Sequence, residues 1–404
     1  MQIQHLSLKN FRNYARLELG FPPGNVLVYG ENAQGKTSLL EALYYLATSS
    51  TPYATSDRQL INWRTKDDPL PFAQVSADVL SADRTLHQLS ITLTWEAPGT
   101  PAERFKKEIR LNKAARRRAE ILGLITVVMF LPQDLLLVEG SPSERRRYMN
   151  MTLNQVDGAY TDALNTFEKV LTQRNALLKQ ISRNRAGADE LLYWDEQLTQ
   201  AAAVIIAGRQ RFLREIEHEA ADIYRALSGH REDLRLAYVP SFEPTAEGSG
   251  QLSFGIPGLD LHRQLSPAQI APQFAEALHA NRYTEIERGM TLFGPQRDEL
   301  RFFVNEHDLG LYGSRGQART AVLAIKLAEL AWMEARIGEP PLLLLDEVAS
   351  ELDEHRRAYL LEQIRHIPQV LLTTTEPAIF NESFLSNATL WKVQAGQIEA
   401  FERG

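Results

Sequence analysis

Residues 30–37 have the types and the spacing of a phosphate-binding loop. They follow an apolar run at 26–29, precede a helical pattern that opens at Ser38, and read Gly30-Glu31-Asn32-Ala33-Gln34-Gly35-Lys36-Thr37. The glycines let successive backbone N–H groups face the phosphates, and the helix N-terminus adds its dipole. Lys36 would reach the β- and γ-phosphates, and the Thr37 hydroxyl would bind Mg²⁺. A glycine turn before a helix is the alternative, but the complete motif in this context predicts a nucleoside triphosphate site.

The metal that accompanies a triphosphate needs a carboxylate, and one follows the apolar run at 341–345. Asp346 and Glu347 come directly after four leucines. Ligands collect at the carboxyl ends of parallel strands, where Asp346 would bind Mg²⁺ through its water shell. Glu347 is placed to polarise the attacking water as general base. A strand that merely ends at a capped turn is the alternative.

Lys36 and Asp346 stand far apart in the chain, so a large insertion must separate the two halves of one site. Residues 143–228 contain no proline and carry wide apolar stripes at helical spacing, broken once at 185–188. We expect two long antiparallel helices there, packed as a subdomain rather than as a free coiled coil. Residues 240–258 have the composition of a loop, and a helix is expected from Ser266 to about Arg282.

Strand patterns flank the insertion. Period-two alternation marks 3–8 and 72–95, a continuous apolar run marks 125–130, and strand texture returns at 300–304. The predicted fold class is α/β, a mixed sheet flanked by helices with a largely helical inserted domain. We expect residues 1–140 to form the first part of the head, 141–290 the helical domain, and 291–404 the second part of the head.

Composition narrows the class of protein. The chain has 404 residues, of which 44% are hydrophobic and 24% charged, as in soluble globular proteins of two or three domains. No apolar run approaches the roughly 18 residues of a membrane span, and the N-terminus has the alternation of a strand rather than a signal peptide. The absence of cysteine excludes disulfides and agrees with a cytoplasmic protein. A net charge of −7 excludes a histone-like polycation but not local nucleic-acid contacts.

A further motif resembles the signature of the ABC-type ATPases in its Ser-x-Gly-Gln form. Ser314, Gly316 and Gln317 stand just before a helical run at 321–335. In that family the signature caps the γ-phosphate bound to a second copy, and a hydroxyl, a glycine N–H and a helix N-terminus suit such an anion. An N-capped surface helix is the alternative. The resemblance implies an ABC-type P-loop ATPase head whose ATP is shared in a homodimer.

Other segments are similar to the same family. Asp353 occupies the place of the D-loop, residues 371–375 that of the switch strand, and Gln133 that of the metal- and water-sensing Q-loop residue. Arg12 matches the arginine that approaches the phosphates. The implied cofactors are ATP and Mg²⁺. The implied roles are catalysis by Lys36, Gln133, Asp346 and Glu347, metal binding by Thr37, Gln133 and Asp346, and nucleotide binding by residues 30–38, Arg12, Ser314, Gly316, Gln317 and Asp353.

Within this group the chain resembles the RecF family nearly from end to end, through its segments at 9–14, 30–37, 135–147 and 291–298. The resemblance implies an ATP-driven dimer that closes on duplex DNA and single-strand/double-strand junctions, with slow DNA-stimulated hydrolysis. The implied partners are RecR and RecO, which load RecA at gaps in repair, replication restart and the SOS response. A nucleoid-associated cytoplasmic location follows.

Three residues depart from the family pattern. Gln296 stands where histidine is usual, Asn150 where aspartate is usual, and Glu347 where a second aspartate is usual. The first two are expected to retune hydrogen bonds between domains. The third should keep the general base and extend its reach by one methylene. None removes a group that nucleotide binding requires.

Two basic clusters stand out in an acidic chain. The first comprises Arg104, Lys106, Lys107, Arg110, Lys113 and Arg116 to Arg118, and the second is 145–147. Such clusters can neutralise DNA phosphates, although a solvated charged face is the common alternative. Residues 145–147 have a third interpretation, which is pairing with carboxylates or sensing of nucleotide. No segment resembles a base-reading module, so any binding should follow backbone and shape.

Two rival functions share the ATPase head. A membrane transporter's ATPase subunit would have a far shorter insertion. A tethering protein of the Smc or Rad50 kind would need coiled coils of hundreds of residues, or cysteines for a zinc hook. The length of the insertion and the absence of cysteine disfavour both.

Overall fold

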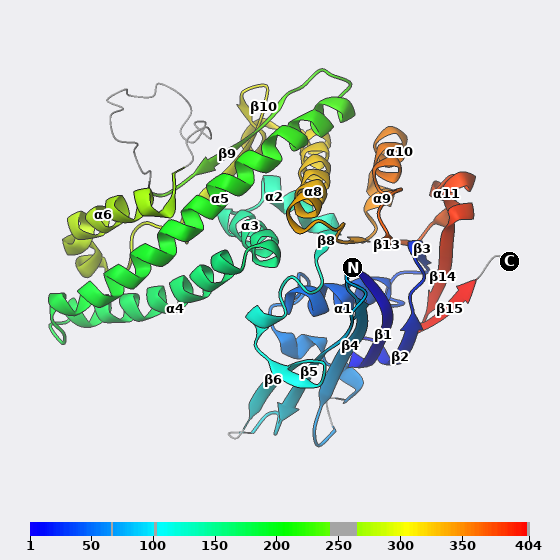
Figure 1. Cartoon of the computed structure of the whole chain (residues 1–404), viewed down its shortest axis with the longest axis horizontal. Coiled ribbons are helices and arrows are strands. Elements are labelled where there is room, and N and C mark those ends of the chain that lie inside the picture. Colours follow the sequence, from blue (N-terminus) through cyan, green and yellow to red (C-terminus); the bar gives the residue numbers. More distant parts are fainter. Residues whose placement is uncertain (66–67, 101–102, 243–264, 402–404) are drawn as a thin grey trace. The chain divides into compact units, whose positions relative to one another are not determined.

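The chain divides into two compact units in the computed structural model, which describes residues 1–65, 68–100, 103–242 and 265–401. The first unit combines Met1–Asp134 with Glu329–Gly404, and the second is Leu135–Ala328 (Figure 1). From the sequence alone we expect these two boundaries between residues 140 and 141 and between residues 290 and 291. The second division differs most, because residues 291–328 belong with the inserted unit rather than with the head.

One sheet of the first unit is antiparallel, with the strand order β2-β1-β4-β5-β6-β7. Its strands are β1 (Gln2–Phe11), β2 (Tyr14–Gly20), β4 (Phe72–Leu80), β5 (Leu86–Glu96), β6 (Arg104–Leu111) and β7 (Ala114–Arg116). The alternation at 3–8 and 72–95 is confirmed: in β4 every second side chain, from Ala73 to Val79, is buried.

The other sheet of this unit is mixed, with the order β15-β14-β3-β13-β12-β8. Its strands are β3 (Gly24–Tyr29), β8 (Val127–Phe130), β12 (Leu342–Leu345), β13 (Gln369–Thr374), β14 (Ala388–Gln394) and β15 (Gln397–Phe401). All neighbours pair in parallel except β15, which is antiparallel to β14. The apolar runs of β8 and β12 are wholly buried, as strands covered on both faces must be. The predicted α/β class is therefore confirmed.

Helix α1 (Lys36–Thr48) follows the phosphate loop and packs against strands of both sheets. It is buried along nearly its whole length, which explains why its sequence is apolar on most sides. The remaining helices and helical turns of this unit are short. They are η1 (Asp57–Leu60), η2 (Trp63–Thr65), η3 (Arg118–Glu120), η4 (Pro132–Leu135), α9 (Val348–Glu351), α10 (Glu354–Gln363), η6 (Pro377–Ile379) and α11 (Glu382–Asn387).

The second unit is largely helical. Its helices are α2 (Leu136–Glu139), α3 (Pro142–Val156), α4 (Gly158–Ile181), α5 (Leu191–Leu227, preceded by the turn η5, Ala188–Glu190), α6 (Pro267–Arg288), α7 (Leu309–Tyr312) and α8 (Arg315–Ile337), in which the division between the units falls. The expected pair of long helices is corrected to three. Asp157 is extended and its side chain accepts a hydrogen bond from Tyr160 N, so it ends α3 and caps α4.

The strand predicted at 300–304 is confirmed as β10 (Glu299–Val304), but its partners were not foreseen. It pairs antiparallel with β9 (Leu234–Val239) and β11 (His307–Asp308) in a separate sheet of the second unit. This pairing accounts for the shifted division, because β10 anchors residues 291–328 to the inserted unit. The predicted loop at 240–258 lies outside the described residues from 243 onward. Within the described ranges, no helix is long and apolar enough to cross a membrane.

Candidate functional site

The phosphate loop connects β3 to α1, as the sequence predicts. Gly30 has φ +153°, and a Cβ there would lie 2.4 Å from the carbonyl oxygen of Val393. Gly35 has φ +124°, and a Cβ there would lie 2.7 Å from Asn13 Nδ2. Both positions therefore require glycine for conformation and for space. At Gly30 the neighbour is backbone, and at Gly35 it is the ends of the Asn13 and Tyr14 side chains.

Two distant hairpins hold the loop in place. From the β14–β15 turn, Ala395 N donates to Gln34 Oε1 at 2.6 Å and Gly396 N to the Gln34 carbonyl at 3.1 Å. From the β1–β2 turn, Asn13 Nδ2 donates to the same carbonyl at 2.8 Å. Tyr14 donates its hydroxyl to the Gly35 carbonyl at 3.0 Å, and burial raises its pKa, so the donor stays protonated. The loop is thus pre-organised without a ligand.

Lys36 lies back across its own loop. Its Nζ donates to the Gly30 carbonyl at 2.7 Å and to the Glu31 carbonyl at 3.1 Å. The same Nζ lies 3.0 Å from Glu347 Oε1, and the lysine is almost fully buried. A buried ammonium needs such partners. Each of them is an oxygen that a phosphate oxygen could replace.

Asp346 is the polar centre of the site. Thr37 Oγ1 donates to its Oδ1 at 3.0 Å, and Thr373 Oγ1 donates to the same oxygen at 2.7 Å. Tyr53 donates to its Oδ2 at 2.6 Å. Burial, and then the charge of Asp346, raise the pKa of Tyr53, so its hydroxyl remains a donor. These bonds fix the orientation of a buried carboxylate at the end of β12.

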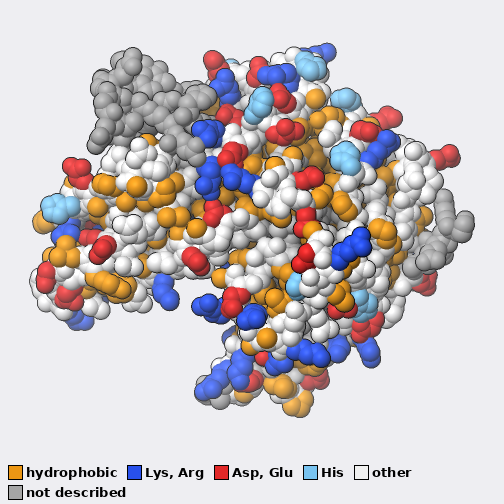
Figure 2. Space-filling model, viewed as in Figure 1, with side chains coloured by type: hydrophobic (Ala, Val, Ile, Leu, Met, Phe, Trp, Pro, Cys, Tyr) orange, Lys and Arg blue, Asp and Glu red, His pale blue; other side chains and the backbone are white. Residues whose placement is uncertain are grey.

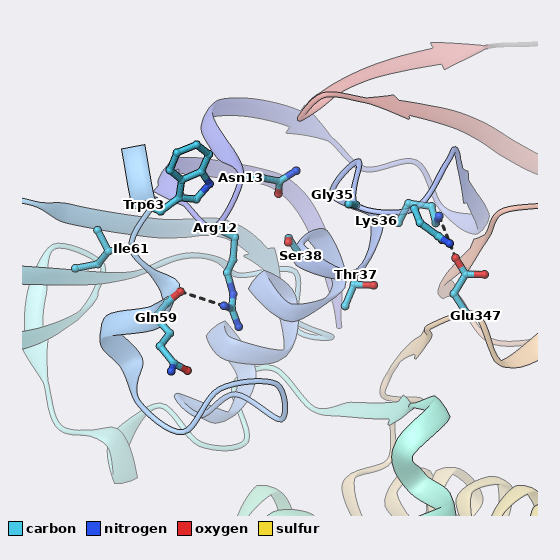
Figure 3. Close-up of a pocket in the computed structure, with 12 residues that line it drawn as sticks. Arg12, Asn13, Gly35, Lys36, Thr37, Ser38, Gln59, Ile61, Trp63 and Glu347 are labelled. Atoms are coloured by element: carbon cyan, nitrogen blue, oxygen red, sulfur yellow. Dashed lines mark hydrogen bonds and ion pairs between the residues drawn. The ribbon is translucent and has the colours of Figure 1, made fainter. Parts of the chain in front are cut away.

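Glu347 has a left-handed backbone with φ 57°. Its N–H donates to Thr373 Oγ1 at 2.9 Å, which holds the turn between β12 and α9. A non-glycine residue in this region is uncommon and carries a cost of about 1–3 kcal/mol. Here the turn directs the side chain toward Lys36 (Figure 3). Strain of this kind gathers at functional sites.

The donor set fits Mg²⁺. Thr37 and Asp346 offer a hydroxyl and a carboxylate oxygen that already lie 3.0 Å apart, and hard oxygen ligands are what Mg²⁺ requires. Among the described residues no group of three or more His, Cys, Asp or Glu side chains could hold a metal. A site of one carboxylate and one hydroxyl therefore depends on phosphate and water for its other ligands, as Mg²⁺ sites at nucleotides do.

A pocket of about 380 Å³ opens beside the loop. Figure 3 shows Lys36 and Glu347 on one side of it and Ile61 and Trp63 on the other. The indole of Trp63 is 71% exposed although it lines the pocket. Asn13 Oδ1 is buried there and has no hydrogen-bond partner among the described residues. A phosphate-binding end, an aromatic end and an unused acceptor suit a nucleotide.

Sequence reasoning missed Trp63, Tyr53 and the acceptor of Asn13. The loop that carries Trp63 is pinned to β1, since Arg12 N donates to the Leu60 carbonyl and Asn62 N to the Asn10 carbonyl, each at 2.8 Å. No periodicity marks such a loop. Asn13 lies in the segment 9–14 and Thr373 in the predicted switch strand. Both segments are singled out by the family resemblance, so these two residues could have been predicted from it.

Arg12 lines the pocket, but its guanidinium is engaged elsewhere. It donates to both carboxylate oxygens of Glu41 on α1, each at 2.7 Å, and to the Gln59 carbonyl at 3.0 Å. Glu41 is almost fully buried and also accepts a bond from Thr51. The pair neutralises the arginine, so any approach to a phosphate would be made by a group already compensated.

Two other predicted residues of the first unit do not line the pocket. Gln133 lies on η4, after β8, whose partner strand β12 carries Asp346 at the same edge of the sheet. Asp353 caps α10, where its Oδ1 accepts from Arg356 N at 2.9 Å. That backbone bond, and the Arg356 charge, lower the pKa of Asp353. Their nucleotide roles stay predictions.

The signature residues belong to the second unit, at the start of α8. Ser314 Oγ accepts from Gln317 N at 3.2 Å, and Gln317 Oε1 accepts from Ser314 N at 2.9 Å. This is a reciprocal capping box. Gln317 Nε2 also donates to Glu232 at 2.8 Å. Ser314 and Gly316 are exposed, so the predicted surface cap and an anion-binding helix end are both compatible with this geometry.

The departures at 150 and 296 have clear surroundings. Asn150 Oδ1 accepts from Tyr160 at 2.6 Å and from Arg209 Nη2 at 3.0 Å, so an amide serves both donors without a charge. Arg209 meanwhile pairs with the buried Asp298 at 3.2 Å. Gln296 donates to the Phe293 carbonyl at 2.9 Å, and its Oε1 is buried without a partner among the described residues.

The first basic cluster lies on β6, on β7 and just beyond them, and Figure 2 shows Lys and Arg gathered over the lower part of the molecule, where Figure 1 labels β5 and β6. Most of these side chains are exposed and several have acidic neighbours: Lys106 with Glu96, Arg110 with Glu108, Arg116 and Arg117 with Glu120, and Lys107 with Asp57. Exposed pairs are weak, so phosphates could compete for these cations.

In the second basic cluster, residues 145–147, Arg145 is paired with a carboxylate, which is one of the interpretations that the sequence allows. Its guanidinium donates to both carboxylate oxygens of Glu299, at 2.6 and 3.0 Å. Its Nη1 also donates to the Gly140 carbonyl at 2.9 Å. Because it is buried and fully engaged within the second unit, Arg145 is not placed to touch DNA.

The phosphate loop between β3 and α1, the acidic end of β12 and the long insertion define a P-loop ATPase head of the ABC type. A family model described as the RecF/RecN/SMC N terminal domain matches residues 2–398. "DNA replication and repair protein RecF" of Herpetosiphon aurantiacus is 40% identical over 98% of this chain and 99% of its own length, and that of Chloroflexus aggregans 39% over 99% and 100%. The chain belongs to the RecF family, which confirms the predicted resemblance.

Solved structures agree. One described as the recombination mediator protein RecF-ATP in the RecFOR pathway has a TM-score of 0.82 at 28% identity, covering 99% of this chain and 97% of that one. An Smc head domain from Pyrococcus furiosus shares the fold alone, with a TM-score of 0.51 at 16% identity, covering 99% of this chain and 95% of that one. Full-length agreement with RecF proteins disfavours the transporter and tethering alternatives.

Proposed function

We propose that this protein is an ATP-dependent DNA-binding recombination mediator in which ATP joins two copies of the chain. The observation that carries the proposal is the pairing across the site: Lys36 with Glu347 at 3.0 Å, and Thr37 with Asp346 at 3.0 Å. Each pair sets a phosphate- or metal-binding group against the acid that would act with it. Membership of the RecF family supplies the connection to DNA repair.

Triphosphate oxygens would replace the carbonyl oxygens and the Glu347 carboxylate now bound to Lys36. Glu347, released from its cation, can then accept a proton from the attacking water at Oε1. Thr37 and Asp346, with Gln133 near the same sheet edge, would hold Mg²⁺, which when bound neutralises charge on the phosphates. Tyr53 and Thr373 keep the Asp346 carboxylate oriented.

The signature of one copy would complete the site of the other. Ser314, Gly316 and Gln317 present an exposed helix N-terminus, and α8 is long enough to sustain a dipole there. Arg12 and Asp353 would act at the same nucleotide. ATP binding favours the dimer because the bound γ-phosphate adds contacts that only the dimer has.

The dimer would bind duplex DNA and single-strand/double-strand junctions at gaps, and slow, DNA-stimulated hydrolysis would release it. RecR and RecO are the proposed partners in loading RecA during repair, replication restart and the SOS response. Work on chromosomal DNA would place the protein in the cytoplasm at the nucleoid. These assignments rest on family membership and on the exposed cations of β6 and β7.

A Ser314→Arg variant tests the two-copy site. The arginine would break the capping box and crowd the partner's γ-phosphate, so ATP should still bind the monomer while ATP-driven dimerisation is lost. Nucleotide titration and sedimentation measure the two properties separately. Ser182→Arg, at the exposed end of α4, is the matched control. Loss of ATP binding in the Ser314→Arg monomer would refute action across a dimer.

Trp63→Ala tests the direction in which the nucleotide lies. If the base stacks on the indole, ATP should bind roughly tenfold more weakly, since base–aromatic stacking contributes about 1–3 kcal/mol. Inorganic tripolyphosphate, which has no base, should bind unchanged. Trp63→Phe, which keeps a ring, should recover most of the affinity. Equal losses for ATP and tripolyphosphate would place the base elsewhere.

A further inference from the structure

A second pocket, in the helical unit, has no part in the nucleotide site. Its volume is about 470 Å³, and it lies between the start of α3, the middle of α4 and the segment that follows α6. The lining residues that can bind a ligand through polar groups include Ser143, Arg146, Asn175, Thr291 and Arg297. Among the described residues that line the pocket, two are cations and none is a carboxylate.

Both guanidiniums donate to backbone carbonyls, and the charges of Glu299 and Asp298 only partly offset that of Arg146. Arg146 Nη1 donates to the Asp298 carbonyl at 3.0 Å, and Arg297 Nη2 to the Thr291 carbonyl at 3.3 Å. Neither forms an ion pair with a carboxylate in the part of the chain that the structure describes. The nearest acids are already engaged, because Glu299 binds Arg145 through both oxygens and Asp298 binds Arg209. Burial, and then the charge of Arg209, lower the pKa of Arg146.

The uncharged groups of the wall add donors. Asn175 Oδ1 accepts from both the N–H and the hydroxyl of Thr291, each at 2.8 Å, which fixes the amide orientation. Among the described residues its Nδ2 has no acceptor. Pro142 and Ser143 bring the first turn of α3, a helix of 15 residues. The hydroxyl of its cap residue, Ser141, does not bond the backbone of that turn and instead pairs with the Ser143 hydroxyl at 2.6 Å. Glu144 is the one acid of that turn and does not line the pocket.

We propose that this pocket binds the phosphodiester backbone of a nucleic acid, through Arg146, Arg297 and the Asn175 amide. Paired guanidiniums and donor groups suit phosphate oxygens. No aromatic ring lines the pocket to stack a base. The inference rests on the proposed function and adds a place on the second unit where DNA is held.

Arg297→Glu, Arg146→Gln and Asn175→Asp test the site. Arg297 is exposed, so its reversal spares the core, and Asn175→Asp keeps the acceptor for Thr291 while replacing a donor by a charge. In fluorescence anisotropy with a labelled duplex, each should weaken binding roughly tenfold. Each arginine variant should also lower the salt slope by about one. Arg288→Glu, an exposed reversal on α6 outside the pocket, should change neither quantity.

Calorimetric titration with inorganic phosphate alone distinguishes a site for the nucleic-acid backbone from a site for free phosphate. Variants that lose duplex affinity beyond the Arg288→Glu control support the proposal. Unchanged duplex binding overturns it, and if phosphate binding alone is lost, the site takes free phosphate instead of a backbone. These results stay distinct from the proposed DNA-binding function, which fails if the wild-type protein binds no duplex at all, or binds it without regard to ATP.

Discussion

A Lys36→Ala variant is expected to remain folded and to lose ATP-driven dimerisation altogether. The lysine is the buried cation of the phosphate loop, and its removal leaves the triphosphate charge facing carbonyl oxygens and Glu347. Loss of a charge-assisted contact of about 1.5–3 kcal/mol weakens ATP binding by roughly ten- to a hundredfold. Equilibrium binding of a fluorescent ATP analogue, followed by light scattering with ATP, measures both effects. Lys392→Ala, an exposed lysine of β14, should behave as wild type.

Mixing two defective variants sharpens this expectation. Lys36→Ala and Ser314→Arg chains can form one composite site with both an intact lysine and an intact serine. The mixture should therefore recover part of the dimerisation that each variant lacks alone. Undiminished dimerisation of Lys36→Ala with ATP, or a mixture no better than its components, would contradict the shared site.

Glu347→Gln is expected to slow hydrolysis by about a hundredfold or more while ATP still drives a dimer that then persists. An amide cannot take the proton of the attacking water, and general-base catalysis typically contributes about 10²–10⁴ in rate. Binding should not weaken, because the variant removes the carboxylate that competes with phosphate for Lys36. Single-turnover hydrolysis and the lifetime of the dimer are the measurements.

The control for this variant is Glu362→Gln, an exposed carboxylate of α10. It makes the same chemical change away from the pocket and should leave turnover intact. Wild-type turnover in Glu347→Gln would assign the base to another group. If the Glu347→Gln dimer dissociates at the wild-type rate, dissociation of the dimer does not depend on ATP hydrolysis.

Contiguous motifs made the phosphate loop predictable from sequence. The loop needs its residues in one order, and the structure shows why, since Gly30 and Gly35 have no room for a side chain. The buried strand before Asp346 was predictable for a similar reason, because a run of four leucines suits a strand covered on both faces.

Other features depend on contacts that no local pattern records. Three helices form instead of two because Asp157, one extended residue inside a continuous helical pattern, separates α3 from α4. Strand β10 has an ordinary strand sequence, and only its pairing with β9 places residues 291–328 in the second unit. Trp63 reaches the site from a short helical turn next to the backbone hydrogen bonds of Leu60 and Asn62, and Tyr53 reaches it from an irregular segment. Neither periodicity nor spacing marks such segments.

The bonds from the β14–β15 turn to Gln34 have a consequence for biosynthesis. A ribosome delivers the phosphate loop well before Ala395 and Gly396, which hold it: Ala395 is made 361 residues after Gln34. Strand β3 likewise waits for β13 and β14, its neighbours on either side. A nascent chain therefore carries the nucleotide motif long before it has the residues that hold the loop in place. The order of translation delays assembly of the phosphate loop until the β14–β15 turn has been made.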